Sequence, residues 1–320
     1  MKEWIDIIRE VENKLDENIQ FALATIIQVE GSAYRSSGAR MLVLEDGSWI
    51  GGISGGCLEG DLLKKAQKAI IEEKSLLITY DTRDDDPFQL GVGLGCNGKI
   101  DIILESNREA IISFIQVLKD VLNSKNGGYI EHLWNLKTQS QELNYTLFEE
   151  KTKFEPNEAS FFEEIRFKEY IKPIYQLWVF GVSFDAPSVI EMGLNLGWRI
   201  NWVGNTNKMN PQLKARCFAC YNWDDDLSIS SEHLIIMMTH DVDRDISILN
   251  NLAKYKQFAY FGSLGPLKRW DKLMGLVDRN TREIFDEMEV STPIGLKIGA
   301  EGPFQIAISI FSEILKILNK

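Results

Sequence analysis

Blocks of apolar residues separated by turn-forming residues predict several strands in the first third of the chain. Residues 21–28 form a continuous apolar, β-branched run, which is typical of a strand covered on both faces. Residues 39–53 contain two further apolar runs, joined at Asp46 and Gly47. Both of these turn residues tolerate positive φ, so the pattern predicts a β-hairpin.

A helix and two more strands complete this first domain. From Leu58 onward, apolar residues recur at helical spacing and charged residues occupy the opposite face. Residues 75–81 and 98–106 predict strands, and the polar, glycine-rich stretch between them predicts a long functional loop. We therefore expect an N-terminal α/β domain over residues 1–105.

The next part of the chain, residues 106–172, has a weaker pattern. Residues 107–122 predict a helix, and residues 127–136 and 143–150 are compatible with strands. Charged residues interrupt the periodicity elsewhere, so we treat this part as a connecting region and assign it no architecture.

The pattern sharpens again in the last part of the chain. A strand over 176–181, a helix that begins near Pro187 and ends at Gly197, and a strand over 199–204 form a βαβ unit. Such a unit requires parallel strands joined by a right-handed crossover. Further strands and helices alternate to the C-terminus, so residues 173–320 predict a Rossmann-like, doubly wound parallel-sheet domain.

Composition and charge narrow the class of protein. The 320 residues are 26% charged and 44% hydrophobic, a balance typical of soluble globular domains. The first twenty residues predict an amphipathic helix rather than a signal or transit peptide, and no apolar run is long enough to span a bilayer. We expect a cytoplasmic protein whose four cysteines are reduced. The net charge of −12 disfavours nucleic acid as a partner.

The clearest candidate for chemistry is the stretch GGISGGCLEG. Cys57 stands at the predicted strand-to-helix junction, where free amides and the helix dipole favour a thiolate. Glu59 and Asp61 oppose that effect through their charge. Gly55 and Gly56 let the backbone approach a ligand closely. Context alone leaves two interpretations open, an exposed reactive thiol and a small buried residue beside a glycine turn.

Two arginines upstream offer donors to the same site. Arg35 and Arg40 lie among glycines and hydroxyl residues, and guanidinium groups suit a phosphate. Surface arginines are usually solvated, so only their place in the same domain as Cys57 favours a binding role.

In the second domain the nucleotide-binding signal is degraded. Gly181, Ser183 and Ala186 occupy the three glycine positions, and Ser183 adds a side chain where a pyrophosphate needs close backbone approach. Gly204 stands near the position where an acid would bind a ribose hydroxyl. A nucleotide site and a scaffold that has lost or altered its ligand both remain open.

Two smaller motifs in this domain also carry alternatives. His240 and Asp241 follow an apolar strand, at the edge where open α/β sheets bind ligands, but Asp241 is equally suited to cap a helix. Cys217 and Cys220 form a C-x-x-C with no second pair of ligands at zinc-site spacing, so we interpret them as incidental.

Taken together, the motifs occur in an order that resembles the XdhC/CoxI family, the accessory proteins of xanthine dehydrogenase and related molybdenum hydroxylases. The motifs are GSAYRSSGARMLV, GGISGGCLE, LGLGCNG, VFGVSFDA, THD, YFGSLG and PIGLKIGAE. The resemblance covers about residues 1–105 and 173–320. It implies a chaperone that binds molybdenum cofactor (molybdopterin), supports its sulfuration and delivers it to an apo-xanthine dehydrogenase or related hydroxylase, rather than an enzyme with turnover. It also implies a cysteine desulfurase as a partner, and we expect a homodimer.

The resemblance assigns site residues as well. Cys57 is the family's prominent cysteine and the candidate for contact with molybdenum, and Cys96 is the second choice. The cofactor-binding residues that it implies are Cys57, Gly55, Gly56, Glu59, Arg35, Arg40, Cys96 and Gly95. If NAD(P) binds, the expected contacts are Gly181, Ser183, Asp185, His240, Asp241 and Gly262.

Departures from the family pattern argue against a nucleotide, because Ser183, Gly204 and Lys297 replace the glycine or acid expected of relatives. Two other functions stay open. One is an NAD(P)-dependent Rossmann oxidoreductase, motivated by the βαβ unit and His240. The other is a protein-binding adaptor that carries no cofactor.

Overall fold

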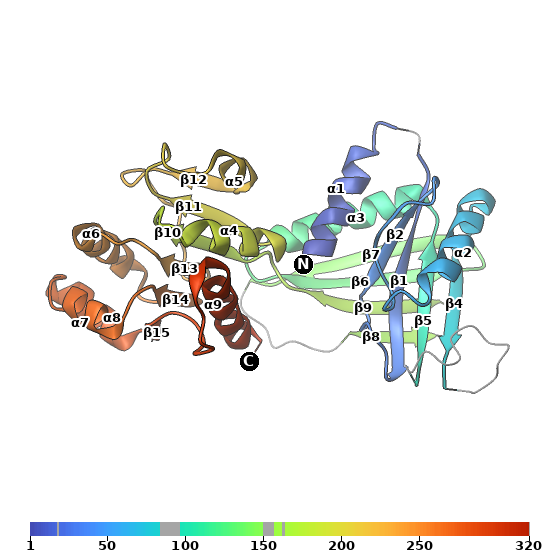
Figure 1. Cartoon of the computed structure of the whole chain (residues 1–320). Helices are drawn as coiled ribbons and strands as arrows, with labels where there is room; N and C mark the ends of the chain where they lie inside the picture. Colours follow the sequence, from blue (N-terminus) through green and yellow to red (C-terminus); the bar gives the residue numbers. More distant parts are fainter. Residues whose placement is uncertain (18, 84–96, 150–156, 162–163, 320) are drawn as a thin grey trace. The chain divides into compact units, whose positions relative to one another are not determined.

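The computed structural model describes residues 1–17, 19–83, 97–149, 157–161 and 164–319. Its backbone contacts divide the chain into an N-terminal unit, Glu3–Pro173, and a C-terminal unit, Ile174–Lys320 with Met1–Lys2. Each unit has helices and sheets of its own (Figure 1).

The N-terminal unit contains two antiparallel sheets. In chain order its elements are α1 (Lys2–Asn13), β1 (Phe21–Gly31), β2 (Arg40–Leu44), β3 (Trp49–Gly51), α2 (Glu59–Glu72), β4 (Leu76–Asp81), β5 (Gly98–Glu105), α3 (Arg108–Asn123), β6 (Gly128–Asn135), β7 (Ser140–Leu147), β8 (Glu158–Phe161) and β9 (Ile165–Ile171). One sheet has the order β3-β2-β1-β5-β4 and the other has the order β7-β6-β9-β8. The predicted hairpin is confirmed, since β2 pairs antiparallel with β3. The region without a predicted architecture forms α3 and the second sheet.

Strand β1 is the centre of this unit and is buried on both faces, as its continuous apolar pattern predicts. On one face Ala24 packs in a cluster with Leu62 of α2. On the other face Ile27 packs in a cluster with Trp134 and Phe167 of the second sheet. Each large apolar side chain buried in this way contributes roughly 1.5–3 kcal/mol to the free energy of unfolding.

The C-terminal unit is a doubly wound parallel sheet, as predicted. Its elements are β10 (Gln176–Phe180), α4 (Ala186–Asn195), β11 (Arg199–Val203), α5 (Pro211–Arg216), β12 (Ala219–Tyr221), β13 (Leu234–Met237), α6 (Val242–Leu252), η1 (Ala253–Tyr255), β14 (Tyr260–Ser263), α7 (Leu267–Met274), α8 (Arg279–Glu287), β15 (Val290–Ser291) and α9 (Gly302–Leu318). The strand order is β12-β11-β10-β13-β14-β15, which is the Rossmann order 3-2-1-4-5-6. The order reverses between β10 and β13, where such sheets bind ligands at the carboxyl ends of the strands.

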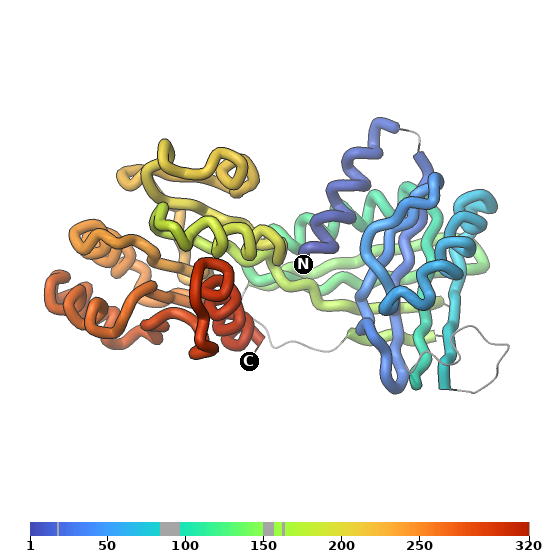
Figure 2. The backbone as a smooth tube through the Cα atoms, viewed as in Figure 1, coloured from blue at the N-terminus to red at the C-terminus, as the bar shows by residue number. Residues whose placement is uncertain are grey.

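Helices cover both faces of the parallel sheet. Helices α4 and α9 run side by side on one face (Figure 2). On this face Phe311 packs against Trp198. Helices α6, α7 and α8 cover the other face, where Phe261 contacts Phe285. The connection from β12 to β13, residues 222–233, contains no helix.

Candidate functional site

The loop that carries Cys57 is shaped by Ser54. The Ser54 hydroxyl oxygen accepts hydrogen bonds from the backbone N–H groups of Gly56, Cys57 and Leu58 at 3.2, 3.1 and 3.1 Å, and the hydroxyl donates to Glu59. One side chain thus engages three amides just before α2, where the helix itself provides no acceptor. Cys57 is left exposed. Of the two interpretations of this residue, the structure supports the exposed thiol.

Glu59 completes the loop from the first turn of α2. Its carboxylate accepts hydrogen bonds from the backbone N–H groups of Ile53 and Ser54 at 3.1 and 2.7 Å. Burial raises the pKa of Glu59, but the hydrogen bonds from Ser54 and the backbone outweigh it, so this pKa lies below its usual value. Glu59 is therefore ionised and holds the loop in shape.

The second acid near the thiol, Asp61, has a cation beside it. Lys65 Nζ lies 2.6 Å from Asp61 Oδ2, and the Tyr80 hydroxyl donates to the same oxygen at 2.7 Å. Burial raises the pKa of Asp61, but these two partners outweigh it and lower this pKa. Lys65 therefore offsets the charge of Asp61.

A small pocket opens beside the thiol. It is lined by residues 32–34, by the 53–58 loop and by parts of β4 and β5. Its volume of about 30 Å³ is room for roughly two water molecules. Tyr34 is 72% exposed and its ring covers Gly55, where a Cβ atom would lie 3.4 Å away. A Cβ atom at Gly56 would meet nothing within 4 Å, so the backbone is open at this position.

Both arginines predicted for this site are engaged by carboxylates. Arg35 Nη1 donates to Glu3 of α1 at 2.9 Å. Arg40 is only 2% exposed, and its guanidinium pairs with the buried carboxylate of Glu169 on β9. The guanidinium also lies 4.3 Å from the ring centre of Trp4. The expectation that Arg40 meets a phosphate is not supported, because its side chain is inside the N-terminal unit.

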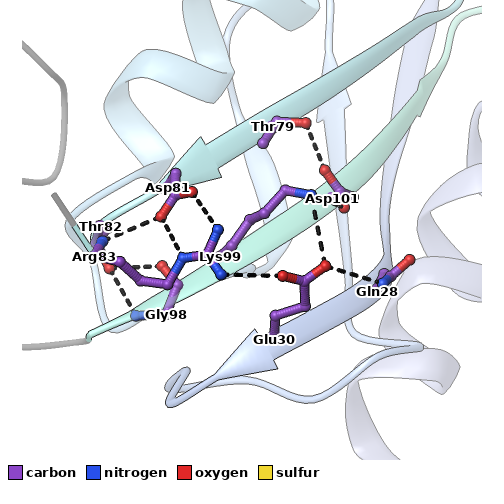
Figure 3. Close-up of polar contacts among 9 residues, drawn as sticks. All are labelled: Gln28, Glu30, Thr79, Asp81, Thr82, Arg83, Gly98, Lys99 and Asp101. Carbon is purple, nitrogen blue, oxygen red and sulfur yellow. Dashed lines mark hydrogen bonds and ion pairs between the residues drawn. The ribbon is translucent and has the colours of Figure 1, made fainter.

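Charged side chains form a ladder across β1, β5 and β4, at the end of the sheet that flanks residues 84–96 (Figure 3). Arg83 pairs with Asp81 at 2.6 Å and with Glu30 at 3.1 Å. Lys99 lies 3.2 Å from Asp101 and 3.7 Å from Glu30. Only the two pairs with Glu30 join different strands, and each pair is partly exposed and contributes little to stability alone.

Backbone contacts at the same end of the sheet connect this ladder to the pocket. Thr82 N donates to Gly98 O at 2.9 Å, and Gly98 N donates to the Thr82 hydroxyl at 3.1 Å (Figure 3). Ser32 N donates to Asn97 O at 3.3 Å. Thr82, Gly98 and Ser32 all line the pocket beside Cys57. The predicted site residues Gly95 and Cys96 lie outside the described residues.

At the carboxyl ends of the parallel strands, the glycine of the predicted nucleotide-binding motif serves packing. Gly181 has a φ of +130°, and a Cβ atom there would lie 2.6 Å from Met238 O of the neighbouring chain segment. The Ser183 hydroxyl oxygen is buried and has no hydrogen-bond partner among the described residues. Asp185 stands at the N-cap position of α4, but its side chain makes no capping hydrogen bond.

The other residues predicted to contact a nucleotide lie in or after β13 and β14. Asp241 caps α6, since its carboxylate accepts from the Arg244 backbone N–H at 3.1 Å, and His240 is exposed. This is the helix cap that the sequence left open as an alternative. Gly262 is buried within β14, where a Cβ atom would lie 2.4 Å from the Ile294 side chain. Close packing explains the glycine at this position.

A larger cavity, which the sequence did not predict, lies at the carboxyl ends of β10 and β11. It has a volume of about 430 Å³, an apolar floor that includes Phe180 and Val203, and walls from α6 and residues 223–229. Three consecutive carboxylates, those of residues 224–226, line it and are exposed. Two cations, Arg244 and Lys254, line the cavity as well, which leaves one negative charge in excess and only weakly disfavours the phosphates of a dinucleotide. The short strand β12 and the helix-free connection after it carry no periodicity from which this cavity could have been foreseen.

In the part of the chain that the structure describes, every helix is too short or too polar to span a lipid bilayer. No three His, Cys, Asp or Glu side chains in the described ranges are grouped so that they could hold a metal ion.

Comparison with known proteins gives consistent matches along the chain. The model of the XdhC and CoxI family matches residues 15–81, and that of the XdhC Rossmann domain matches residues 177–314. The chain is 28% identical to a Bacillus subtilis (strain 168) protein named as a probable xanthine dehydrogenase subunit, with 94% of each covered. It is 24% identical to the molybdenum cofactor insertion chaperone PaoD of Escherichia coli (strain K12), over 92% of this chain and 82% of that protein. It is also similar to a crystal structure described as a xanthine dehydrogenase from Bacillus halodurans, with a TM-score of 0.76, 27% identity and coverage of 98% and 95%.

Proposed function

The chain belongs to the XdhC and CoxI family, and on that premise we propose that it binds molybdenum cofactor at the Cys57 loop and delivers it to a molybdenum hydroxylase. The likeness to a protein named as a molybdenum cofactor insertion chaperone supports an accessory role of this kind. The observation that carries the proposal is the exposed thiol of Cys57, held at the surface by the Ser54 and Glu59 hydrogen bonds.

The donor set of the loop fits the cofactor in part. When bound, the cofactor supplies a soft molybdenum–sulfur centre, for which a thiolate is a suitable ligand. The open backbone at Gly56 permits a close approach, while the small pocket excludes everything larger than a few atoms. Cys57 would hold the metal end, and the loop backbone from Gly55 to Cys57 would support the rest. The phosphate has no assigned cation, because Arg35 and Arg40 are paired with carboxylates.

Sulfuration and delivery are the finer parts of the proposal. Transfer of sulfur requires that a thiolate and the donor sulfur meet, and an exposed Cys57 allows a cysteine desulfurase to reach it. Cys96 stays the second candidate thiol, since Asn97, the residue after it, is hydrogen bonded to Ser32 at the pocket. An apo-hydroxylase of the xanthine dehydrogenase class is the proposed recipient, and a homodimer is the proposed assembly.

The decisive test is cofactor retention by the full chain. The protein is purified without oxygen from cells that make molybdenum cofactor, and molybdenum and released pterin are measured per chain. We expect the Cys57→Ser variant to retain at least tenfold less of both than the unaltered protein. Cys220→Ser, which alters a thiol in the other unit, is the matched control and keeps full occupancy. Equal occupancy in the Cys57→Ser variant would refute the role of the thiol.

The adaptor alternative predicts a different outcome. An adaptor would form a complex with the hydroxylase whether or not cofactor is present, and its Cys57→Ser variant would bind the partner normally. Our proposal predicts instead that the hydroxylase gains activity only from cofactor-loaded protein.

A further inference from the structure

Two half-buried cysteines lie at the junction of α5 and β12. Cys217 is the C-cap residue of α5, and Cys220 lies in β12 only three residues later. The backbone N–H of Cys217 donates to Lys214 O at 3.3 Å, and the Cys220 thiol donates to the same oxygen at 3.8 Å. This shared acceptor places the Cys220 sulfur beside the backbone of Cys217, and each thiol affects the pKa of the other, as neighbouring side chains do.

The surroundings of the pair limit its chemistry. Both side chains pack against the core cluster on the α4 and α9 face of the parallel sheet. Burial raises the pKa of Cys217 to about 12, and the neighbouring Cys220 adds to the rise. Burial also raises the pKa of Cys220, but its hydrogen bond with Cys217 partly offsets this. Cys220 is therefore the thiol that ionises more readily.

A structural zinc site needs four ligands, and no third His, Cys, Asp or Glu joins the pair among the described residues. Two neighbouring thiols have one other characteristic reaction, the formation of a disulfide by thiol–disulfide exchange.

We propose that Cys217 and Cys220 are a redox-active pair that forms an intramolecular disulfide, with a small aliphatic disulfide as the oxidant. The Cys220 thiolate attacks one sulfur of the small disulfide, which forms a mixed disulfide and releases one small thiolate that takes up a proton. Cys217 then gives its proton to solvent and attacks the Cys220 sulfur, which releases the second small thiol. The protein loses two hydrogens, and the small disulfide is reduced to two thiols.

This pair belongs to the C-terminal unit, whereas Cys57 belongs to the N-terminal unit. The new bond would tie the end of α5 to β12, the edge strand of the parallel sheet. Oxidation would therefore add a covalent link at this edge strand. It would not consume the Cys57 thiol, which the proposed binding of the cofactor requires.

The test uses the full chain with Cys57→Ser and Cys96→Ser, so that only the two thiols in question remain. After treatment with 2-hydroxyethyl disulfide, we expect intact mass to show the loss of two hydrogens and peptide mapping to show the Cys217–Cys220 bond. The same chain with Cys220→Ser is the control and cannot form the bond. Stable adducts of the small thiol on both cysteines, or disulfide-linked pairs of chains, would overturn the proposal.

A second measurement covers the outcome in which exchange is slow in the folded protein. Phenylarsine oxide bridges two thiols only when they are adjacent. We expect one arsenical per folded chain, and at least tenfold weaker binding when either Cys217 or Cys220 is replaced by Ser. Equal binding by the single variants would show that the thiols act separately and would refute the pair.

Discussion

Arg40 is held inside the N-terminal unit by charge and by aromatic rings. Its guanidinium pairs with Glu169, whose carboxylate also lies 2.8 Å from His132 Nε2. The guanidinium is within 4.3 and 4.7 Å of the ring centres of Trp4 and Phe114, which adds cation–π attraction. The Arg40–Glu169 pair joins β2 of one sheet to β9 of the other.

Removing one partner of this pair tests its role. In the Glu169→Gln variant the charge of Arg40 stays buried without a counter-charge, so we expect the free energy of unfolding to fall by about 3–5 kcal/mol. Urea titration followed by circular dichroism measures the change. Glu283→Gln is the control, because it removes an exposed pair with Arg279 and should cost less than about 1 kcal/mol. A loss in the Glu169→Gln variant as small as that of the control would contradict the assignment.

The same residues predict that the protein is sensitive to acid. Burial opposes the ionised form of Glu169, but Arg40 and His132 outweigh it and lower its pKa to about 2, from 4.5 in the unfolded chain. Burial lowers the pKa of His132 below 6.5. The unfolded chain therefore binds protons at both residues more readily than the folded chain does.

The contribution of these two residues to the free energy of unfolding is therefore at its maximum above about pH 6.5. It falls as the pH drops, first below 6.5 because of His132 and then between 4.5 and about 2 because of Glu169. The Glu169 contribution amounts to about 3 kcal/mol. Unfolding midpoints between about pH 7 and about pH 3 measure the effect. The Glu169→Gln variant should lose less stability over this range, and parallel curves for the two proteins would disprove the linkage.

The sequence could not reveal this role of Arg40 because the partner lies 129 residues away. Strand β9 alternates buried and exposed positions, but Glu169 occupies one of the buried positions and breaks its apolar pattern. An arginine among glycines and hydroxyl residues therefore resembled a phosphate ligand. The buried charge became interpretable only once both sheets were known.

At the scale of elements, the turn from β3 into the Cys57 loop depends on Gly51. This residue has a φ of +81°, and a Cβ atom would lie 2.3 Å from Arg40 O. Gly51→Ala therefore combines backbone strain with a clash, and we expect a loss of about 2 kcal/mol or more in the free energy of unfolding. Gly60→Ala is the matched control, because Gly60 lies in α2 and a Cβ atom there meets nothing within 4 Å. It should stabilise the protein by up to about 1 kcal/mol, and equal effects would contradict the argument.

Strong periodicity explains which elements could be predicted. Strand β1, helix α2 and the β10–α4–β11 unit have long apolar patterns of one period, and the structure confirms all three. Strand β12 has only three residues and was not predicted. The Cys57 loop could be proposed because its thiol and glycines are adjacent in the sequence. Its pocket could not, since Ser32, Thr82 and Gly98 come from three separate segments.

The edge of the parallel sheet gives a prediction about nucleotides. Ser183 stands where a pyrophosphate needs a glycine, and the carboxylates of residues 224–226 line the adjacent cavity. We expect saturating NAD(H) or NADP(H) to leave the Tm unchanged. A ligand present at a hundred times its Kd would add about 2.7 kcal/mol to stability and would be visible as a higher Tm. A rise of that size would support the oxidoreductase alternative.

At the scale of the whole molecule, each unit has a core of its own. The clusters around β1 lie within Glu3–Pro173, and those on the two faces of the parallel sheet lie within Ile174–Lys320. A substitution in one of these clusters therefore removes contacts within its own unit. This separation allows the site of ligand binding to be located from stability measurements on the full chain.

We expect thermal unfolding of the full chain to show two transitions. Glu169→Gln should lower only the transition of the N-terminal unit, by roughly 6–12 °C for a loss of about 3 kcal/mol. Ile236→Ala, in the core of the C-terminal unit, should lower only the other. Because Cys57 belongs to the N-terminal unit, bound molybdenum cofactor should raise only the transition that Glu169→Gln lowers, and Cys57→Ser should abolish that rise. A rise confined to the transition that Ile236→Ala lowers would move the cofactor site to the parallel sheet and away from Cys57.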